Sequence, residues 1–309
     1  MRIAFLGTPE FALPSLQMLI DTEHTLCVFT QPDKPQGRHA VLTAPPVKVL
    51  AQQYGIPVYQ PRRMRDAEGL EPLRAFQPDL MVTAAFGQLL SAENLSIPQY
   101  GCINVHGSLL PKYRGAAPIQ WAVIDGEAVT GITTMLTDVG LDTGDILLTR
   151  ELSILPDETA GELYARMAEL GAEVLKETIE KLANGTLART PQQEEQATKC
   201  RMLKKEDGKL AFNQSAKSVH DRVRGVNPWP GAYAYMEDGM DTLKIWRTRM
   251  TEEKPQGEPG MLYGDEKRGL FVCCADGVLE ILELQAAGGK RMEAKAYLRG
   301  KPLAGLKLI

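Results

Sequence analysis

The first 110 residues alternate short apolar runs with longer amphipathic segments, and this alternation limits the possible fold more than any other feature. Strands are predicted at 2–7, 25–30, 57–61, 79–85 and 101–107, and helices at 9–20, 47–55 and 66–76. Strands separated by helices indicate βαβ units and a mostly parallel sheet. Both faces of a parallel strand are covered, which explains why the runs are apolar throughout. The fold class predicted for this part is α/β with a Rossmann-like sheet.

The pattern changes after these strands. Two further strands, at 131–138 and 145–152, are joined by a short glycine-rich turn and therefore predict an antiparallel pair. A long amphipathic helix is predicted over 159–185. Thr159 and Glu162 have the spacing of a capping box at its start.

The last third of the chain has the pattern of a small all-β domain. Short β-like runs with glycine turns occur at 242–250, 260–264, 270–274 and 278–285, which predicts a small barrel or sandwich. The polar residues 186–203 show no core face and are interpreted as a linker. We therefore predict a domain at 1–185, a linker at 186–203 and a second domain at 204–309.

Three other segments carry specific expectations. Residues 31–46 contain several turn signals and little periodicity, so we expect a long loop without regular structure. His220 lies on a short amphipathic stretch and is expected at the surface. Trp229, Tyr233 and Tyr235 are expected to anchor the core and the turns of the second domain.

Cysteine and histidine usage argues against disulfides and structural zinc. The five cysteines lack CxxC spacing, and an odd number in a long chain does not suit a disulfide framework. No pair among the four histidines has the spacing of metal ligands, so we expect no metal.

No apolar run approaches the ~20 residues that span a bilayer. Because the chain begins directly with a core strand, we expect no signal peptide. Together, these features predict a cytoplasmic protein without membrane contact.

Charge is distributed unevenly along the chain. Residues 1–200 contain 16 basic and 24 acidic side chains, whereas residues 201–309 contain 19 and 15. A basic C-terminal part on an acidic body favours a polyanionic partner for that end. The alternative is random drift of surface charge.

Two polar residues interrupt the apolar run at 101–107. Asn104 and His106 stand two apart, so a strand directs both side chains to the same face. Ligands of open parallel sheets bind at the carboxyl ends of the strands, where this pair would lie. The structural alternative is a core histidine bonded to a core asparagine. The glycine–serine turn that follows at once favours the functional interpretation.

The turn between the two later strands contains Asp138, Asp142 and Asp145 beside two glycines. A carboxylate next to a histidine fixes its tautomer. An Asn, a His and an Asp together suit polarisation of a carbonyl and movement of an amine proton. The spacing does not show which aspartate takes part. The chain lacks the GxGxxG and GxxxxGK[ST] motifs, and no GxSxG elbow surrounds Ser108.

The stretches NVHGSLLPKYRGAAPIQWAVIDGE and GITTMLTDVGLDTGDIL resemble the formyltransferase family that uses 10-formyltetrahydrofolate. FLGTPEFALPSL, FTQPDKPQGR and VNPWPGAYAY extend the resemblance over nearly the whole chain, towards members that act on methionyl initiator tRNA. The resemblance implies an OB-like barrel from residue 204 onward and a folate that acts as a cosubstrate. We expect a monomer. The implied site residues are Asn104, His106 and Asp142 for catalysis and Ser108, Leu109, Leu110 and Pro111 for the folate.

Basic residues outside these sets are candidates for binding the tRNA. They are Lys34 and Arg38 in the segment 31–46, and Arg114 after the SLLP turn. The alternatives for Arg114 are the glutamate tail of the folate and a solvated rim. Relatives often carry more lysines after QPDKPQGR, where this chain has HAVL, so Arg38 stands alone there.

Two rival functions fit parts of the sequence. A sugar-nucleotide formyltransferase would share the catalytic core but would not need a basic RNA-binding tail. A non-catalytic RNA-binding protein would not need the intact set of Asn104, His106 and Asp142.

Overall fold

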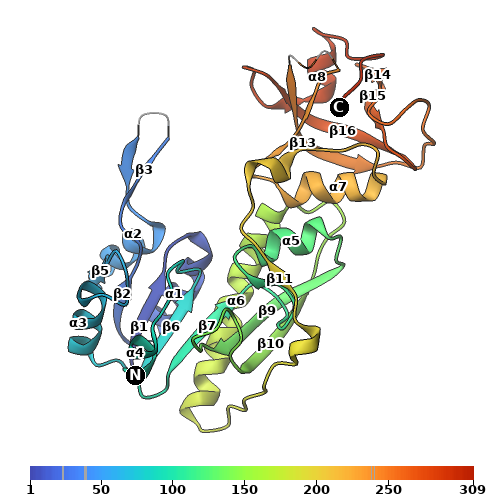
Figure 1. Cartoon of the computed structure of the whole chain (residues 1–309). Helices are drawn as coiled ribbons and strands as arrows, with labels where there is room; N and C mark the ends of the chain where they lie inside the picture. The colour runs from blue at the N-terminus through green and yellow to red at the C-terminus, as the bar shows by residue number, and fades with distance from the viewer. Residues whose placement is uncertain (23, 38–39, 238, 240) are drawn as a thin grey trace. The chain divides into compact units, whose positions relative to one another are not determined.

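The computed structural model describes residues 1–309 except 23, 38, 39, 238 and 240. The described chain forms two compact units, neither of which is continuous in sequence (Figure 1). Unit 1 comprises Met1–Gly115, Thr130–Leu152 and Tyr164–Lys199, and unit 2 comprises Ala116–Val129, Ser153–Leu163 and Cys200–Ile309. Each unit is organised around its own main sheet.

Unit 1 is built on a seven-stranded sheet with the order β10-β9-β7-β6-β1-β2-β5. Its strands are β1 (Arg2–Gly7), β2 (Thr25–Phe29), β5 (Val58–Tyr59), β6 (Leu80–Ala84), β7 (Cys102–His106), β9 (Val129–Leu136) and β10 (Ile146–Ser153). The pairs from β5 to β7 are all parallel, and β9 runs antiparallel to β7. The Rossmann-like, mostly parallel sheet is therefore confirmed.

Strands β9 and β10 run in opposite directions, as predicted. Leu136, at the end of β9, donates its backbone N–H to the carbonyl oxygen of Asp145, directly before β10 begins. Further along, the N–H of Leu148 lies 3.2 Å from the hydroxyl of Thr134. The residues of β9 therefore pair with those of β10 in reverse order, which makes the two strands antiparallel.

Helices connect these strands close to the predicted positions. They are η1 (Glu10–Ala12), α1 (Leu13–Asp21), α2 (Pro46–Gln53), α3 (Ala67–Phe76) and α6 (Ala160–Ala183). A further short helix, α4 (Ala92–Ser96), lies where none was predicted. The capping box at the start of α6 is present, because Glu162 accepts from the N–H of Thr159 at 2.9 Å and returns its own N–H to the Thr159 hydroxyl. No helix in the described part of the chain is long and apolar enough to cross a membrane.

The segment 31–46 is not the structureless loop that its turn signals predict. It forms an antiparallel hairpin from β3 (Lys34–Gln36) and β4 (Val41–Thr43). Val41 and Leu42 are both exposed. None of the strand side chains that the structure describes in this hairpin is buried, so hydrophobic periodicity, the main sequence signal for a strand, could not reveal it.

Unit 2 contains a second sheet with the order β12-β13-β16-β15-β14, and β17 pairs with β16. All of its strand pairs are antiparallel. The strands are β12 (Ala232–Tyr235), β13 (Thr242–Met250), β14 (Leu262–Asp265), β15 (Gly269–Cys273), β16 (Val278–Ala286) and β17 (Met292–Glu293). The four short strands predicted for this part of the chain are all present.

The C-terminal residues connect the two edges of this sheet. Tyr235, at the end of β12, exchanges backbone hydrogen bonds with Ile309. Leu308 donates its N–H to the carbonyl oxygen of Gly260, just before β14. Both edge strands are thereby paired with the same terminal segment. The sheet closes into a small barrel, as expected for the C-terminal part.

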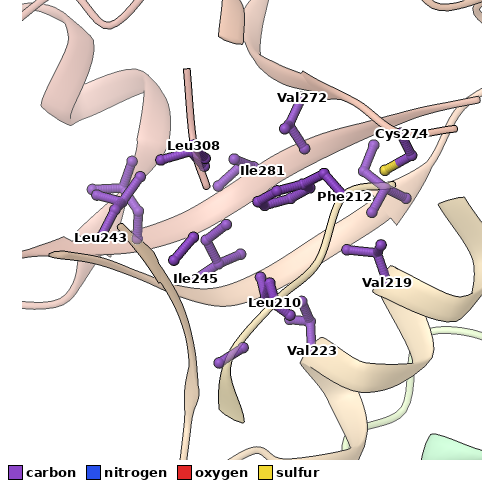
Figure 2. Close-up of a cluster of buried hydrophobic side chains, with 14 of the residues drawn as sticks. Leu210, Phe212, Val219, Val223, Leu243, Ile245, Val272, Cys274, Ile281 and Leu308 are labelled. Carbon is purple, nitrogen blue, oxygen red and sulfur yellow. The ribbon is translucent and has the colours of Figure 1, made fainter. Parts of the chain in front are cut away.

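Helices complete the core of unit 2. They are α5 (Pro118–Ile124), α7 (Ala216–Gly225) and α8 (Ala294–Leu298). Val219 and Val223 of α7 point into the same buried cluster as Phe212 and Ile281 (Figure 2). Ile124 of α5 belongs to this cluster too. The core of the barrel therefore depends partly on a helix that precedes β9, β10 and α6 in the chain.

Two expectations for unit 2 are wrong. His220 is only 4% exposed, because it follows Val219 on the inward stripe of α7. Its Nδ1 lies 2.9 Å from the hydroxyl of Thr248, and its Nε2 lies 3.1 Å from the carbonyl oxygen of Pro156. Trp229 is 54% exposed and is not a core anchor.

Candidate active site

Asn104 and His106 lie at the carboxyl end of β7, two residues apart. Thr83 on β6 stands opposite Asn104 in the strand register. Its hydroxyl donates to Asn104 Oδ1 at 2.9 Å. This bond fixes the amide so that Nδ2 is its remaining donor group, and Nδ2 makes no hydrogen bond to any described residue.

His106 is 6% exposed and its two ring nitrogens have different surroundings. Nε2 lies 3.0 Å from the carbonyl oxygen of Tyr113. A carbonyl oxygen can only accept, so Nε2 carries a hydrogen and Nδ1 is the nitrogen that faces Asp142. Nδ1 lies 3.8 Å from Asp142 Oδ2. This distance is too long for a hydrogen bond, but it places a carboxylate oxygen beside the imidazole ring.

Asp142 lies in the turn between β9 and β10 and has a left-handed backbone with φ +53°. Its Oδ2 accepts the N–H of Gly115 at 2.8 Å. The side-chain amide of Gln192 donates to the carbonyl oxygens of Asp142 and Gly144 at 2.9 and 2.7 Å. A left-handed non-glycine residue costs on the order of 1 kcal/mol, and these hydrogen bonds offset that strain.

Asp138 has different partners from Asp142. Its carboxylate accepts the N–H of Gly140 at 3.0 Å and the hydroxyl of Thr143 at 2.7 Å. It therefore stabilises its own turn, as aspartates in turns commonly do. Of these two carboxylates, Asp142 is the one that approaches His106.

The SLLP turn, Ser108 to Pro111, is held from inside the protein. The buried Ser108 hydroxyl donates to the carbonyl oxygen of Lys112 at 2.6 Å. The Thr133 hydroxyl donates to the Ser108 carbonyl at 2.7 Å and accepts the N–H of Leu110 at 3.1 Å. The side chains of Ser108 and Leu110 are buried, whereas Leu109 and Pro111 are half-buried. Leu109 and Pro111 are therefore the members of the turn that remain accessible to a ligand.

The basic candidates are placed differently from the sequence-based expectation. Arg114 is 1% exposed and is bound to Gln192 and Glu194. This burial does not suit a tRNA phosphate or a solvated rim, and we reassign Arg114 to the support of the site. Lys34 is exposed on β3, where its ammonium group bonds to the side chain of Gln31. Arg38 lies outside the described residues.

Three residues that the sequence did not single out complete the arrangement: Thr83, Tyr113 and Gln192. The role of Thr83 depends on its register with Asn104, and Tyr113 contributes a backbone carbonyl, which any residue type would supply. Gln192 lies in the predicted linker, fifty residues from Asp142. Within the described ranges, no group of three or more His, Cys, Asp or Glu residues is arranged to hold a metal ion.

Comparison with known proteins shows which family this chain belongs to. The family described as formyl transferase matches residues 1–179, and the formyl transferase C-terminal domain matches residues 202–302. The methionyl-tRNA formyltransferase of Ruminiclostridium cellulolyticum is 50% identical, over 98% of this chain and 97% of that protein. That of Geotalea daltonii is also 50% identical, over 100% of this chain and 98% of its own. The chain belongs to the methionyl-tRNA formyltransferase family.

Solved structures share the fold of this formyltransferase chain. HypX from Aquifex aeolicus, in complex with tetrahydrofolic acid, matches with a TM-score of 0.66 at 19% identity. The match covers 99% of this chain but 48% of HypX, so the chain spans about half the length of that protein. WlaRD, a sugar 3N-formyl transferase solved with dTDP and 5-N-formyl-THF, matches with a TM-score of 0.69 at 18% identity, over 93% and 97% of the two chains.

Proposed function

We propose that this chain transfers the formyl group of 10-formyltetrahydrofolate to the free amino group of methionyl initiator tRNA, for translation initiation. The observation that carries the proposal is the convergence of Asn104, His106 and Asp142 at the carboxyl end of the sheet. Near-complete alignment with methionyl-tRNA formyltransferases supports the choice of substrates.

In the proposed reaction, the methionyl amine attacks the formyl carbon of the folate. The formyl oxygen then gains negative charge in a tetrahedral intermediate. Asn104 Nδ2 is a donor for this oxygen, and Thr83 holds its amide in the required orientation. His106 in its cationic form offers Nδ1–H as a second donor. Loss of one such donor typically costs about 10²–10³-fold in rate.

The attacking amine must lose a proton and the folate N10 must gain one. Asp142 stabilises the imidazolium of His106 and accepts the amine proton, directly or through a water. Collapse of the intermediate breaks the bond between the formyl carbon and N10, and the proton passes to N10. The products are the formamide on the tRNA and tetrahydrofolate, with no metal and no covalent enzyme intermediate.

We assign catalysis to residues 1–185, tRNA binding to residues 204–309 and their connection to residues 186–203. The excess of basic residues after residue 200 supports the second assignment, as does the barrel, an architecture used to bind oligonucleotides. Lys34 and Arg38 are assigned to the tRNA and Ser108 to Pro111 to the folate. The protein is expected to act as a cytoplasmic monomer.

A substrate comparison tests the proposal. The enzyme is incubated with 10-formyltetrahydrofolate and either methionyl initiator tRNA or an amino-sugar nucleotide, and products are identified by mass spectrometry. Formylation of the methionyl amine alone is the expected result. Formylation of the sugar alone would assign the chain to the sugar-nucleotide branch, and no turnover with either would support a non-catalytic role.

A further inference from the structure

Gln192 belongs to the polar segment 186–203, yet its amide is directed at the turn that carries Asp142. Nε2 donates to the carbonyl oxygens of Asp142 and Gly144 at 2.9 and 2.7 Å. Oε1 accepts the Nε hydrogen of Arg114 at 3.0 Å. A glutamine amide has two N–H donors and one oxygen acceptor. Both donor hydrogens and the oxygen of this side chain are therefore engaged.

Arg114 determines which way round this amide lies. Its guanidinium is buried and donates to Glu194 at 2.7 Å through Nη1. A guanidinium stays charged and has no acceptor, so only the oxygen of Gln192 can face it. The Nε2 group must then face the turn, where two carbonyl oxygens accept its hydrogen bonds.

Gly115, which follows Arg114 in the chain, also binds Asp142. Gly115 donates its N–H to the Asp142 carboxylate at 2.8 Å, while Gln192 donates to the Asp142 backbone carbonyl. The left-handed φ of +53° is one that a non-glycine residue keeps only when its surroundings impose it. Both contacts therefore act on the orientation of the carboxylate beside His106.

We propose that Gln192 is a positioning residue for formyl transfer, which holds the turn at 142–144 so that the Asp142 carboxylate stays next to His106. The inference rests on the proposed function. It adds that Gln192, in the predicted linker, sets the geometry of the site. A residue with this role affects the rate of the chemical step more than the binding of either substrate.

Gln192→Glu is the sharpest test, because it keeps the size of the side chain and an oxygen for Arg114. It replaces the two donated hydrogen bonds by a carboxylate oxygen that faces two carbonyl oxygens. Misplacement of a catalytic group by about 1 Å can cost about 10²-fold. We expect kcat to fall about 10- to 100-fold, with KM for methionyl-tRNA and for the folate within about 3-fold. Gln193→Glu is the matched control, since Gln193 is exposed and its oxygen accepts from Gln196.

A second readout separates positioning from a general loss of stability. Because Gln192 acts through Asp142, adding Gln192→Glu to Asp142→Asn should lower kcat by less than about 2-fold further. A fully additive loss, or a single variant whose kcat equals that of Gln193→Glu, would overturn the inference. If thermal unfolding shows that Gln192→Glu is not folded, Gln192→Met takes its place with the same expected values. An undiminished Asp142→Asn enzyme would refute the proposed chemistry itself, and this role with it.

Discussion

At the residue scale, the two polar side chains on an otherwise apolar strand have a structural explanation. Asn104 receives the Thr83 hydroxyl, and His106 donates to the Tyr113 carbonyl. Neither is only a core residue satisfied by the other, because their partners lie on other segments of the chain. Each side chain is therefore held by one hydrogen bond, which leaves Asn104 Nδ2 and His106 Nδ1 without a hydrogen bond to any described residue.

Asp142 and Asp138 provide a paired prediction. Asp142→Asn should lower the single-turnover rate of formyl transfer by about 10²–10⁴-fold, because the amide cannot accept the amine proton. Asp138→Asn should stay within about 5-fold, since Asp138 bonds to Gly140 and Thr143 of its own turn. The measurement is rapid-quench formylation of methionyl-tRNA. The reverse order of the two rates would show that the other aspartate is the catalytic one.

At the element scale, helices that bury an apolar stripe and strands that bury an apolar face were predictable from sequence. Apolar runs predicted the strands of the parallel sheet, and the pair Thr159 and Glu162 predicted the start of α6. The same apolar pattern indicates the site, because Asn104 and His106 interrupt the apolar run of a buried strand. Such signals are local in the chain, so a single sequence carries them.

Elements without a core face, and contacts that span long stretches of sequence, were not predictable. The hairpin β3–β4 exposes Val41 and Leu42, so it lacks the periodicity that predicts a strand. The segment 186–203 is polar, which suits a linker, yet Gln192 reaches the turn of Asp142. The choice of Asp142 over its neighbours also depends on tertiary contacts that spacing cannot give.

The closure of the barrel leads to a stability prediction. A Cβ added to Gly260 would lie 2.1 Å from the carbonyl oxygen of Leu308, whereas one added to Gly288 meets nothing within 4 Å. Both glycines have positive φ, at +89° and +69°, so alanine is strained at each by about 1–2 kcal/mol. Gly260→Ala should lose about 1–3 kcal/mol more, because it also separates the terminal segment from the sheet.

Chemical denaturation of the two alanine variants measures this difference in the free energy of unfolding. Gly288→Ala is the control for backbone strain alone. Equal losses of stability would mean that the pairing of Gly260 with Leu308 does not help to close the barrel.

At the scale of the whole molecule, the compact units do not follow the order of the chain. Residues 116–129 and 153–163 belong to unit 2 although they lie within the predicted first domain. Ile124 of α5 is part of the barrel's core. Removal of residues 204–309 would therefore expose apolar side chains of α5 in addition to removing the barrel.

Binding of tRNA should depend strongly on salt if the basic residues contact phosphates. For about six contacts, affinity is expected to fall on the order of 10³-fold between 50 and 200 mM salt. Lys34→Ala should reduce the slope of log K against log salt by about one. Filter binding or fluorescence titration with methionyl initiator tRNA measures both quantities. Affinity that does not change with salt would contradict an electrostatic grip on the tRNA.

In the proposed reaction, Asn104 and His106 stabilise the oxygen of the formyl group during its transfer to methionyl-tRNA. The decisive measurement is the single-turnover formylation rate of Asn104→Ala and of His106→Ala, with the affinity for tRNA measured on the same preparations. Each variant is predicted to lose about 10²–10³-fold in rate, while its affinity for tRNA stays within about 3-fold of the unaltered enzyme. A rate equal to that of the unaltered enzyme in either variant would show that the altered residue does not stabilise the formyl oxygen.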